Sequence, residues 1–347
     1  MFNKFLGKFS KDLGIDLGTT STLVHIPDKG IVINEPSVVA VNMRTDEILA
    51  VGEEAKKMVG KTPSHIQAIR PLVDGVISDF EVTEKMLKYF IDKVHSESFT
   101  LIPRPRVVIG IPLDITEVEK KAVEDAAKSA GAREVYLIEE SMAAAIGARL
   151  PVADATATMI IDIGGGTTEI AVISLGGAVT WKTLRLAGNS LDNDIIQYVR
   201  EEFNILIGEQ VAENIKIKIG SAVPLREKME MPLRGRDLIN GLPKEVIVND
   251  GQIREAMQRT INQIIENIKI TLETTPPELV ADIYEHGIVL TGGGALLRGI
   301  DKEIAQAAKI PVRVADDPLT CMVRGASILL SDPELLAKVM SGGTDNF

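Results

Sequence analysis

The strongest constraint on this chain is a hairpin motif that occurs twice, an apolar run followed by aspartate, glycine and threonine. The first copy reads Leu-Gly-Ile-Asp16-Leu-Gly-Thr-Thr over residues 13–20, and the second reads Met-Ile-Ile-Asp162-Ile-Gly-Gly-Gly-Thr-Thr over residues 159–168. Each copy is typical of a buried strand, a tight turn and a returning β-branched strand. Two such hairpins, about 146 positions apart, predict two related halves that face each other across one ligand.

The turns of both hairpins carry residue types that bind phosphate. Glycine at position 18 and at positions 164–166 lets backbone N–H groups approach phosphate oxygens without an intervening side chain. The threonines beside these glycines add hydroxyl donors. Asp16 and Asp162 each precede a turn, where a carboxylate can hold Mg²⁺ through water against the phosphates. One such turn is a weak signal, but the pair can enclose a triphosphate.

The rest of the sequence predicts an α/β fold with a mixed sheet in each half. Apolar, strand-like runs alternate with helical segments along both halves, which is the pattern of such folds. Helices are expected at residues 142–150 and, after a strand and a glycine loop, from about Ala295. The length of 347 residues suits roughly two domains.

Composition excludes several kinds of partner and compartment. The net charge is −11, whereas a broad nucleic-acid surface needs an excess of lysine and arginine. Cys321 is the only cysteine, so a reducing compartment is expected. No apolar run approaches the ~18 residues of a membrane span, and the N-terminus lacks a secretory signal pattern. We therefore expect a cytoplasmic protein that binds no nucleic acid.

Two segments have the pattern of local membrane contacts. If residues 1–11 are helical, four large apolar side chains share one face and three lysines share another, as in an interfacial helix. A second apolar group, at residues 99–102, lies on an expected loop. Docking on the protein's own surface is the alternative for the first segment, and packing against the adjacent helix is an equally good one for the second. The side chains are Phe2, Phe5, Leu6 and Phe9, and Phe99, Leu101 and Ile102.

Four motifs resemble those of the actin, heat-shock chaperone and sugar kinase ATPase superfamily. They are Asp16-Leu-Gly-Thr-Thr, Asp162-Ile-Gly-Gly-Gly-Thr, Glu139-Glu140-Ser-Met-Ala-Ala-Ala and Leu290-Thr-Gly-Gly-Gly-Ala-Leu-Leu. Further stretches, among them Asn34-Glu-Pro-Ser-Val-Val and Ala68-Ile-Arg-Pro-Leu-Val-Asp-Gly-Val-Ile, closely resemble the MreB family of bacterial actins. The similarity covers about residues 12–335, nearly the whole chain.

The resemblance implies an actin-like ATPase fold, with two duplicated ribonuclease-H-like domains, a smaller subdomain inserted in each, and a nucleotide cleft between them. The implied boundaries are an N-terminal amphipathic arm at 1–11, a first core subdomain (IA) at 12–34, 73–153 and 323–345, its insertion (IB) at 35–72, a second core subdomain (IIA) at 154–188 and 253–322, and its insertion (IIB) at 189–252.

The resemblance also implies a catalytic set. Glu140 matches the carboxylate that orients the water attacking the γ-phosphate, with help from Thr167, while Asp16 and Asp162 complete the catalytic and metal-binding residues. Ser141 stands where the family commonly has proline. Because serine is a good helix N-cap, we expect the local geometry to survive.

The resemblance also implies that two residues on one helix contact the nucleoside. Glu213 matches the family residue beside the ribose and Lys216 the one beside adenine, whereas a surface ion pair between them, at i and i+3, is the simpler alternative. The nucleotide-binding residues implied in full are Gly18, Thr19, Thr20, Ser21, Gly164, Gly165, Gly166, Thr167, Thr168, Glu213, Asn214, Ile215, Lys216, Gly292, Gly293, Gly294, Ala295 and Leu296.

The function implied by the resemblance is that of a filament-forming, slow ATPase. Such a protein binds ATP and Mg²⁺, polymerises on the inner face of the cytoplasmic membrane, and maintains rod shape by organising cell-wall synthesis with a membrane adaptor and the wall-elongation complex. The alternatives are a non-polymerising or specialised paralogue, a chaperone ATPase, which would need a peptide-binding domain, and a small-molecule kinase, which would need an acceptor pocket.

Overall fold

A computed structural model describes residues 10–96 and 103–342 of the chain. The side chains predicted to contact a membrane, Phe2, Phe5, Leu6, Phe9, Phe99, Leu101 and Ile102, lie outside the described residues, so both membrane segments stay predictions. Within the described ranges, no helix has the length and apolarity needed to cross a bilayer.

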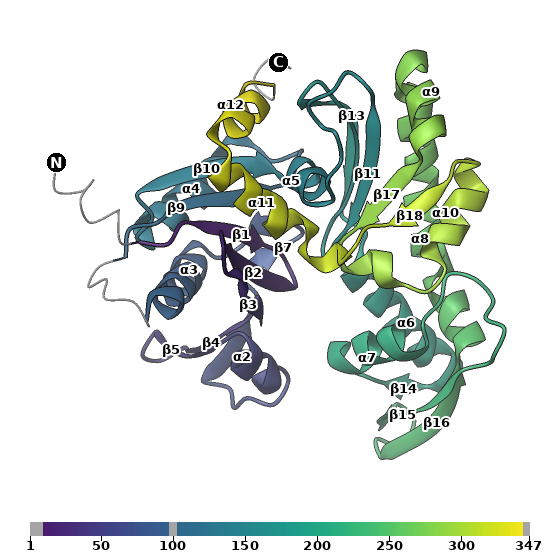
Figure 1. Cartoon of the computed structure of the whole chain (residues 1–347). Helices are drawn as coiled ribbons and strands as arrows, with labels where there is room; N and C mark the ends of the chain where they lie inside the picture. Colours follow the sequence, from purple (N-terminus) through teal and green to yellow (C-terminus); the bar gives the residue numbers. More distant parts are fainter. Residues whose placement is uncertain (1–9, 97–102, 343–347) are drawn as a thin grey trace.

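Two five-stranded sheets with the same strand order form the two halves of the molecule (Figure 1). Each sheet has three parallel strands and continues through an antiparallel hairpin into a third antiparallel strand. The first sheet consists of β10 (Glu134–Glu139), β9 (Arg106–Ile111), β1 (Leu13–Leu17), β2 (Ser21–Ile26) and β3 (Gly30–Pro36). The second consists of β18 (Val312–Val314), β17 (Ile288–Thr291), β11 (Thr158–Ile163), β12 (Thr168–Ser174) and β13 (Gly177–Leu184). The duplication predicted from the two hairpins therefore extends to the whole sheet.

Helices cover the outer face of each sheet and complete two separate apolar cores. On the first sheet lie α3 (Phe80–His95) and α4 (Glu117–Ser129), and on the second lie α8 (Asp250–Thr274), α9 (Pro277–His286) and α10 (Ile300–Ala308). α6 (Gly188–Phe203) and α7 (Glu209–Ile219) pack against α8 and contribute to the same core as the second sheet. The helix termini follow local sequence signals. For example, α4 begins after a capping box in which the side chains of Thr116 and Glu119 reciprocally accept hydrogen bonds from each other's backbone N–H.

Two helices lie between the sheets and join the halves. They are α5 (Glu140–Gly147) and α11 (Cys321–Ser331), and Figure 1 shows α11 crossing from one half to the other. Both pack into a third apolar cluster that includes Leu23 of the first sheet and Ile160 of the second. After α11 the chain ends its described part in α12 (Pro333–Gly342). The interior of the molecule is thus a sheet–helix–sheet sandwich.

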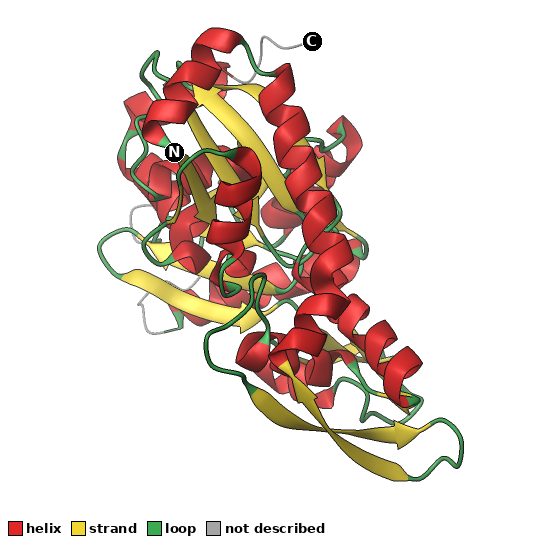
Figure 2. Cartoon of the chain, turned by 90° about the vertical axis from the view of Figure 1, so that its right-hand side faces the viewer, coloured by secondary structure: helices red, strands yellow, loops and turns green. Residues whose placement is uncertain are grey.

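Two small β units extend from the halves. The first contains β4 (Val39–Asn42), β5 (Glu47–Val51), α2 (Glu53–Met58) and β6 (Ile66–Ile69), followed by the hairpin of β7 (Leu72–Val73) and β8 (Val76–Ile77). The second contains β14 (Ile205–Leu206), β15 (Glu230–Asp237) and β16 (Pro243–Asn249), and its long hairpin projects at the lower end of the molecule in Figure 2. The subdomain boundaries given above stay predictions.

The structure corrects three local predictions. The helix expected from about Ala295 is a short 3-10 turn, η2 (Gly293–Leu296), and the following α-helix begins only at Ile300, because Gly299 adopts φ +75° and breaks the turn. The helix expected at residues 142–150 runs from Glu140 to Gly147 instead. Ser141 is therefore not its N-cap; Glu139 holds that position, and Ser141 lies inside the first turn.

Candidate functional site

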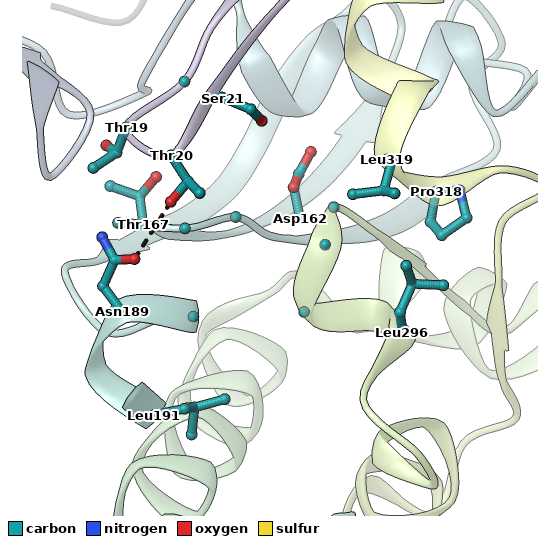
Figure 3. Close-up of a pocket in the computed structure, with 18 of the residues that line it drawn as sticks. Thr19, Thr20, Ser21, Asp162, Thr167, Asn189, Leu191, Leu296, Pro318 and Leu319 are labelled. Atoms are coloured by element: carbon teal, nitrogen blue, oxygen red, sulfur yellow. Dashed lines mark hydrogen bonds between the residues drawn. The ribbon is translucent and has the colours of Figure 1, made fainter. Parts of the chain in front are cut away.

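The two repeated hairpins meet tip to tip at the junction of the halves (Figure 3). Thr20 Oγ1 of the first donates to Asn189 Oδ1 of the second half across 3.3 Å. A Cβ atom at position 165 would overlap the Thr20 side chain, and one at Gly166 would lie 2.7 Å from Thr19 Oγ1. Glycine is therefore needed in the second hairpin because a side chain there would collide with the threonines of the first. This requirement is separate from any need to leave room for a ligand.

A cavity of about 380 Å³ opens beneath this contact, between the halves. Its volume lies within the range of small-molecule and cofactor sites. The sequence-predicted residues that line it are Asp16, Gly18, Thr19, Thr20, Ser21, Glu140, Asp162, Gly164, Gly165, Gly166, Thr167, Glu213, Lys216, Gly292, Gly293, Gly294 and Leu296. Segments separated by almost 280 positions thus converge on one cavity.

Four of the residues assigned to nucleotide contact do not line the cavity. Thr168 is buried and its Oγ1 donates to the Leu186 carbonyl oxygen at 2.6 Å, which ties the hairpin to the segment between β13 and α6. Ile215 and Ala295 are buried in the core of the second half, and Asn214 is exposed. Residues next to these four in the sequence line the cavity instead.

Two aspartates face each other on the cavity floor. Burial, and then the charge of Asp162, raises the pKa of Asp16 to about 7, and burial raises the pKa of Asp162 to about 6. Among the residues that the structure describes, neither carboxyl group forms an ion pair with a cationic side chain. Oxygen ligands that hold a metal through water suit Mg²⁺, so this donor set fits the predicted ion. No cluster of three or more His, Cys, Asp or Glu side chains forms a direct metal site among the residues that the structure describes.

Glu140 lies at the first position of α5 and points into the same cavity. Burial, followed by the charges of Glu169, Asp16 and Asp162, raises its pKa well above the usual value. A carboxyl group whose pKa is raised by its surroundings is a good candidate for proton transfer near neutral pH.

Glu169 is a buried acid that the sequence analysis did not assign. Its Oε1 accepts from the Leu113 N–H at 2.7 Å and its Oε2 from the Ser141 N–H at 3.0 Å. The side chain thereby ties β12 to the start of α5, one residue after Glu140. Its only signal in the sequence is an acidic residue inside an otherwise apolar strand.

Glu213 and Lys216 do not pair with each other, so the simpler surface-pair alternative is wrong. Lys216 Nζ donates to the Gly188 carbonyl oxygen at 2.7 Å and lies 2.9 Å from Asp192 Oδ1. Glu213 Oε2 lies 2.9 Å from Nζ of Lys56 on the small unit of the opposite half. Both side chains nevertheless line the cavity.

A glycine turn and a second short helical turn close the remaining wall. Gly292 adopts φ +79°, and a Cβ there would overlap the Asp162 carboxylate. Beyond it, η3 (Pro318–Thr320) brings apolar side chains to the opening, as Figure 3 shows for Pro318 and Leu319. The lining residues that sequence reasoning did not assign are Leu23, Gly75, Gly188, Asn189, Leu191, Asp192, Ile217, Leu297, Arg298, Pro318, Leu319 and Met322.

Known proteins share this sequence and this fold. Residues 10–338 match the family model described as MreB/Mbl protein. The cell shape-determining protein MreB of Escherichia coli K12 is 53% identical over 329 residues, 94% of each chain. The crystal structure of MreB 5 of Spiroplasma citri bound to AMPPNP aligns with a TM-score of 0.89 at 38% identity, over 96% of this chain and 99% of that one. The MamK double helical filament aligns with a TM-score of 0.77 at 25% identity, over 92% and 98%.

Proposed function

Because the chain belongs to the MreB/Mbl family and shares its actin-like fold, we propose that it is a filament-forming ATPase that maintains rod cell shape by organising cell-wall synthesis. ATP binds in the cavity between the halves, and its slow hydrolysis is coupled to polymerisation. The observation that carries the proposal is the convergence of two phosphate-type hairpins, a recessed glutamate and a glycine turn on one cavity.

The hairpins would hold the phosphates from both sides. Backbone N–H groups of the glycine turns and the hydroxyl groups of Thr19, Thr20 and Thr167 converge on the cavity, where oriented donors bind phosphate oxygens. Lys216 and Glu213 stand farther along the wall, where the nucleoside would lie. A relative at 38% identity is bound to AMPPNP, which supports a nucleotide as the ligand.

Glu140 would orient and polarise the attacking water. Its carboxyl group is held at the start of a helix that is itself fixed between the sheets, so the group needs little reorganisation during the reaction. Thr167 lines the same part of the cavity and would assist. Once deprotonated, Glu140 can accept the proton that the water loses.

Asp16 and Asp162 would hold Mg²⁺ through water. When bound, the ion supplies positive charge against the developing charge on the phosphates. A bound cation would also lower the raised pKa values of both aspartates.

The filament and its location rest on relatives and on the N-terminal pattern. The relatives include a cell shape-determining protein and a double helical filament. The amphipathic arm at residues 1–11 and the apolar loop at residues 99–102 would place filaments on the inner face of the cytoplasmic membrane, where a membrane adaptor and the cell-wall elongation complex would bind.

Electron microscopy of the purified chain tests the polymer. With ATP, Mg²⁺ and anionic liposomes, we expect filaments on the lipid surface, and filaments without liposomes at higher protein concentration. Monomers under all concentrations and nucleotides would contradict polymerisation and favour the non-polymerising paralogue.

Substitution of Glu140 tests the catalytic assignment. In Glu140→Ala, ATP binding should be retained while phosphate release falls about a hundredfold or more, because the water loses its orienting base. The matched control is Glu139→Ala, the adjacent acid, which does not line the cavity. Equal phosphate release by wild type and Glu140→Ala would remove Glu140 from the mechanism.

A further inference from the structure

A second cavity, of about 240 Å³, lies on the far side of α11 from the nucleotide cavity. Three elements form it. They are the end of β2 and the turn after it, the C-terminal end of α5, and one face of α11. Its lining residues are His25, Pro27, Asp28, Gly147, Arg149, Arg324, Ser327, Ile328 and Ser331.

The local folding rules explain why these side chains converge. The four α11 residues have spacing i, i+3, i+4 and i+7, so they share one face of the helix. His25 shares a face of β2 with Leu23, which packs against α5 and α11. Its partner across the ladder on β1 is Gly14, against which α11 packs so closely that a Cβ there would lie 3.0 Å from Ser327 N.

The cavity contains cationic groups that the protein leaves without an acidic partner. Within the described residues, neither Arg149 nor Arg324 forms an ion pair with a carboxylate. Arg324 Nη2 donates to the Asp316 carbonyl oxygen at 2.7 Å, but its buried Nε–H has no hydrogen-bond partner, and the same is true of buried Nδ1 of His25. Buried polar atoms normally have partners. An arginine N–H can only donate, so the Nε–H of Arg324 is an unsatisfied donor beside the cavity.

The backbone holds Arg149 at the rim in an uncommon conformation. Its φ is +60°, in the left-handed region that favours glycine. The residue follows the last turn of α5, and its N–H donates to the Ile146 carbonyl oxygen at 2.9 Å. A long cationic side chain therefore lies beside the cavity at a position where glycine is the usual residue.

The net charge of the lining residues favours a singly charged anion over a doubly charged one. Two arginines and one aspartate leave a single positive charge while His25 is neutral. Burial and the neighbouring charge of Arg324 lower the pKa of His25, so it is neutral at pH 7. Asp28 at the rim opposes a doubly charged phosphate more strongly than a singly charged carboxylate. Guanidinium groups bind carboxylates through paired hydrogen bonds.

We propose that the cavity bounded by His25, Arg149 and Arg324 is a carboxylate-binding site, separate from the nucleotide cavity. The carboxylate comes either from a free organic acid or from an acidic side chain of a protein segment that docks at this face. The inference does not depend on the proposed function, since none of these three residues lines the nucleotide cavity.

Nuclear magnetic resonance titration of His25 in the full chain tests the site. The imidazole pKa is measured at constant ionic strength without addition, with succinate, with the blocked peptide acetyl-Gly-Glu-Gly-amide, and with inorganic phosphate. Succinate or the peptide should raise the pKa of His25, because a bound carboxylate favours the charged imidazole. A larger effect of succinate assigns the site to free acids, and tighter binding of the peptide assigns it to a protein side chain.

Two variants that remove a positive charge from the cavity, and one control variant outside it, test whether the arginines bind the carboxylate. Arg149→Gln, at an exposed position, and Arg324→Gln should each weaken carboxylate binding at least tenfold, the loss typical of a charged hydrogen bond. Arg313→Gln on β18 removes the same charge from an exposed site away from the cavity and should bind as wild type does. The proposal is wrong if neither carboxylate moves the pKa of His25, if phosphate alone moves it, or if Arg149→Gln binds carboxylate as tightly as the control.

Discussion

At the scale of single residues, the most informative side chain is one that does not face the cavity. Glu169 accepts two backbone N–H groups, one from the loop after β9 and one from the first turn of α5. It therefore fixes the backbone on which Glu140 stands. We regard Glu169 as a positioning residue, because it acts on the reaction through Glu140.

Glu169→Gln should lower kcat more than it changes KM for ATP. An amide has only one acceptor oxygen, so one of the two backbone N–H groups loses its partner and α5 begins in a less defined position. We expect kcat to fall about tenfold with KM within about twofold, measured by steady-state phosphate release. Equal changes in kcat and KM would point to a general loss of structure instead.

The same substitution should change how stability depends on pH. Burial raises the pKa of Glu169 from 4.5 to about 8 in the folded protein. Its contribution to stability is therefore complete below about pH 4.5 and is lost as pH rises through about 8. In urea unfolding of the nucleotide-free wild type, Glu169 should contribute a loss of at most about 1.4 kcal/mol per pH unit between pH 5 and 8, and Glu169→Gln should show a correspondingly smaller slope.

The sequence predicted the cavity-lining residues that belong to the repeated hairpin or to a motif shared with the family, but not the residues whose role depends on tertiary contact. Asp16 and Asp162 were found because each precedes a glycine turn and the turn occurs twice. Glu169 could not be found in this way, since its role is defined by N–H groups 28 and 56 positions away. The hydrogen bond of Asn189 could not be predicted for the same reason, because its partner Thr20 lies in the other half.

At the scale of elements, the decisive contact is the crossing of α5 and α11. A Cβ at position 325 would overlap the Ala143 carbonyl oxygen, and one at position 147 would overlap the carbonyl oxygen of Cys321. The two helices thus meet backbone to backbone, which only glycine permits. Through this crossing, the helix that carries Glu140 is locked to the helix that carries Met322 into the cavity wall.

Gly325→Ala should be strongly destabilising. The added methyl group must separate the two helices, and such overpacking costs about 1–3 kcal/mol or more. Denaturant unfolding measures the effect. Gly251→Ala, in the first turn of α8, is the matched control, because helix propensity favours alanine there and the nearest atom is the end of the Asn249 side chain, at 3.1 Å. Similar stability of the two variants would contradict the tight crossing.

The element predictions succeeded where periodicity and glycine position agreed. The strand–helix alternation was sufficient for most helices and for both hairpins. It failed after Thr291, where three glycines followed by apolar residues were interpreted as a loop and a helix start. The chain instead forms the 3-10 turn η2 and then a left-handed residue at Gly299, and backbone angles of this kind are not encoded in a hydrophobic pattern.

At the scale of the whole molecule, side-chain contacts outside the cavity join the two halves. Arg70, just after β6, lies 2.8 Å from Glu209 of α7. Gln210 Nε2 donates to the Lys56 carbonyl oxygen at 2.7 Å. These contacts join the small unit of the first half to α7 of the second, and neither Arg70 nor Gln210 lines the cavity.

The double variant Arg70→Ala, Gln210→Ala should release nucleotide faster. Partly exposed pairs of this kind contribute up to about 1 kcal/mol each, so we expect an increase of about two- to tenfold in the release rate of a fluorescent ATP analogue. Lys57→Ala is the control, since Lys57 lies on the same helix as Lys56 but pairs with Glu54 within that helix. An unchanged release rate in the double variant would show that these contacts do not hold the cavity closed.

The position of α11 in the chain order has a consequence for biosynthesis. The lining residues of the cavity run in chain order from Asp16 to Met322, which lies on α11. Because α11 is near the end of the chain, it can pack between the sheets only after nearly all of the chain has been synthesised. A nascent chain on the ribosome can therefore form each hairpin early, but it presents a complete binding cavity only when α11 has emerged. Occupancy by ligand would then distinguish finished molecules from partly synthesised ones.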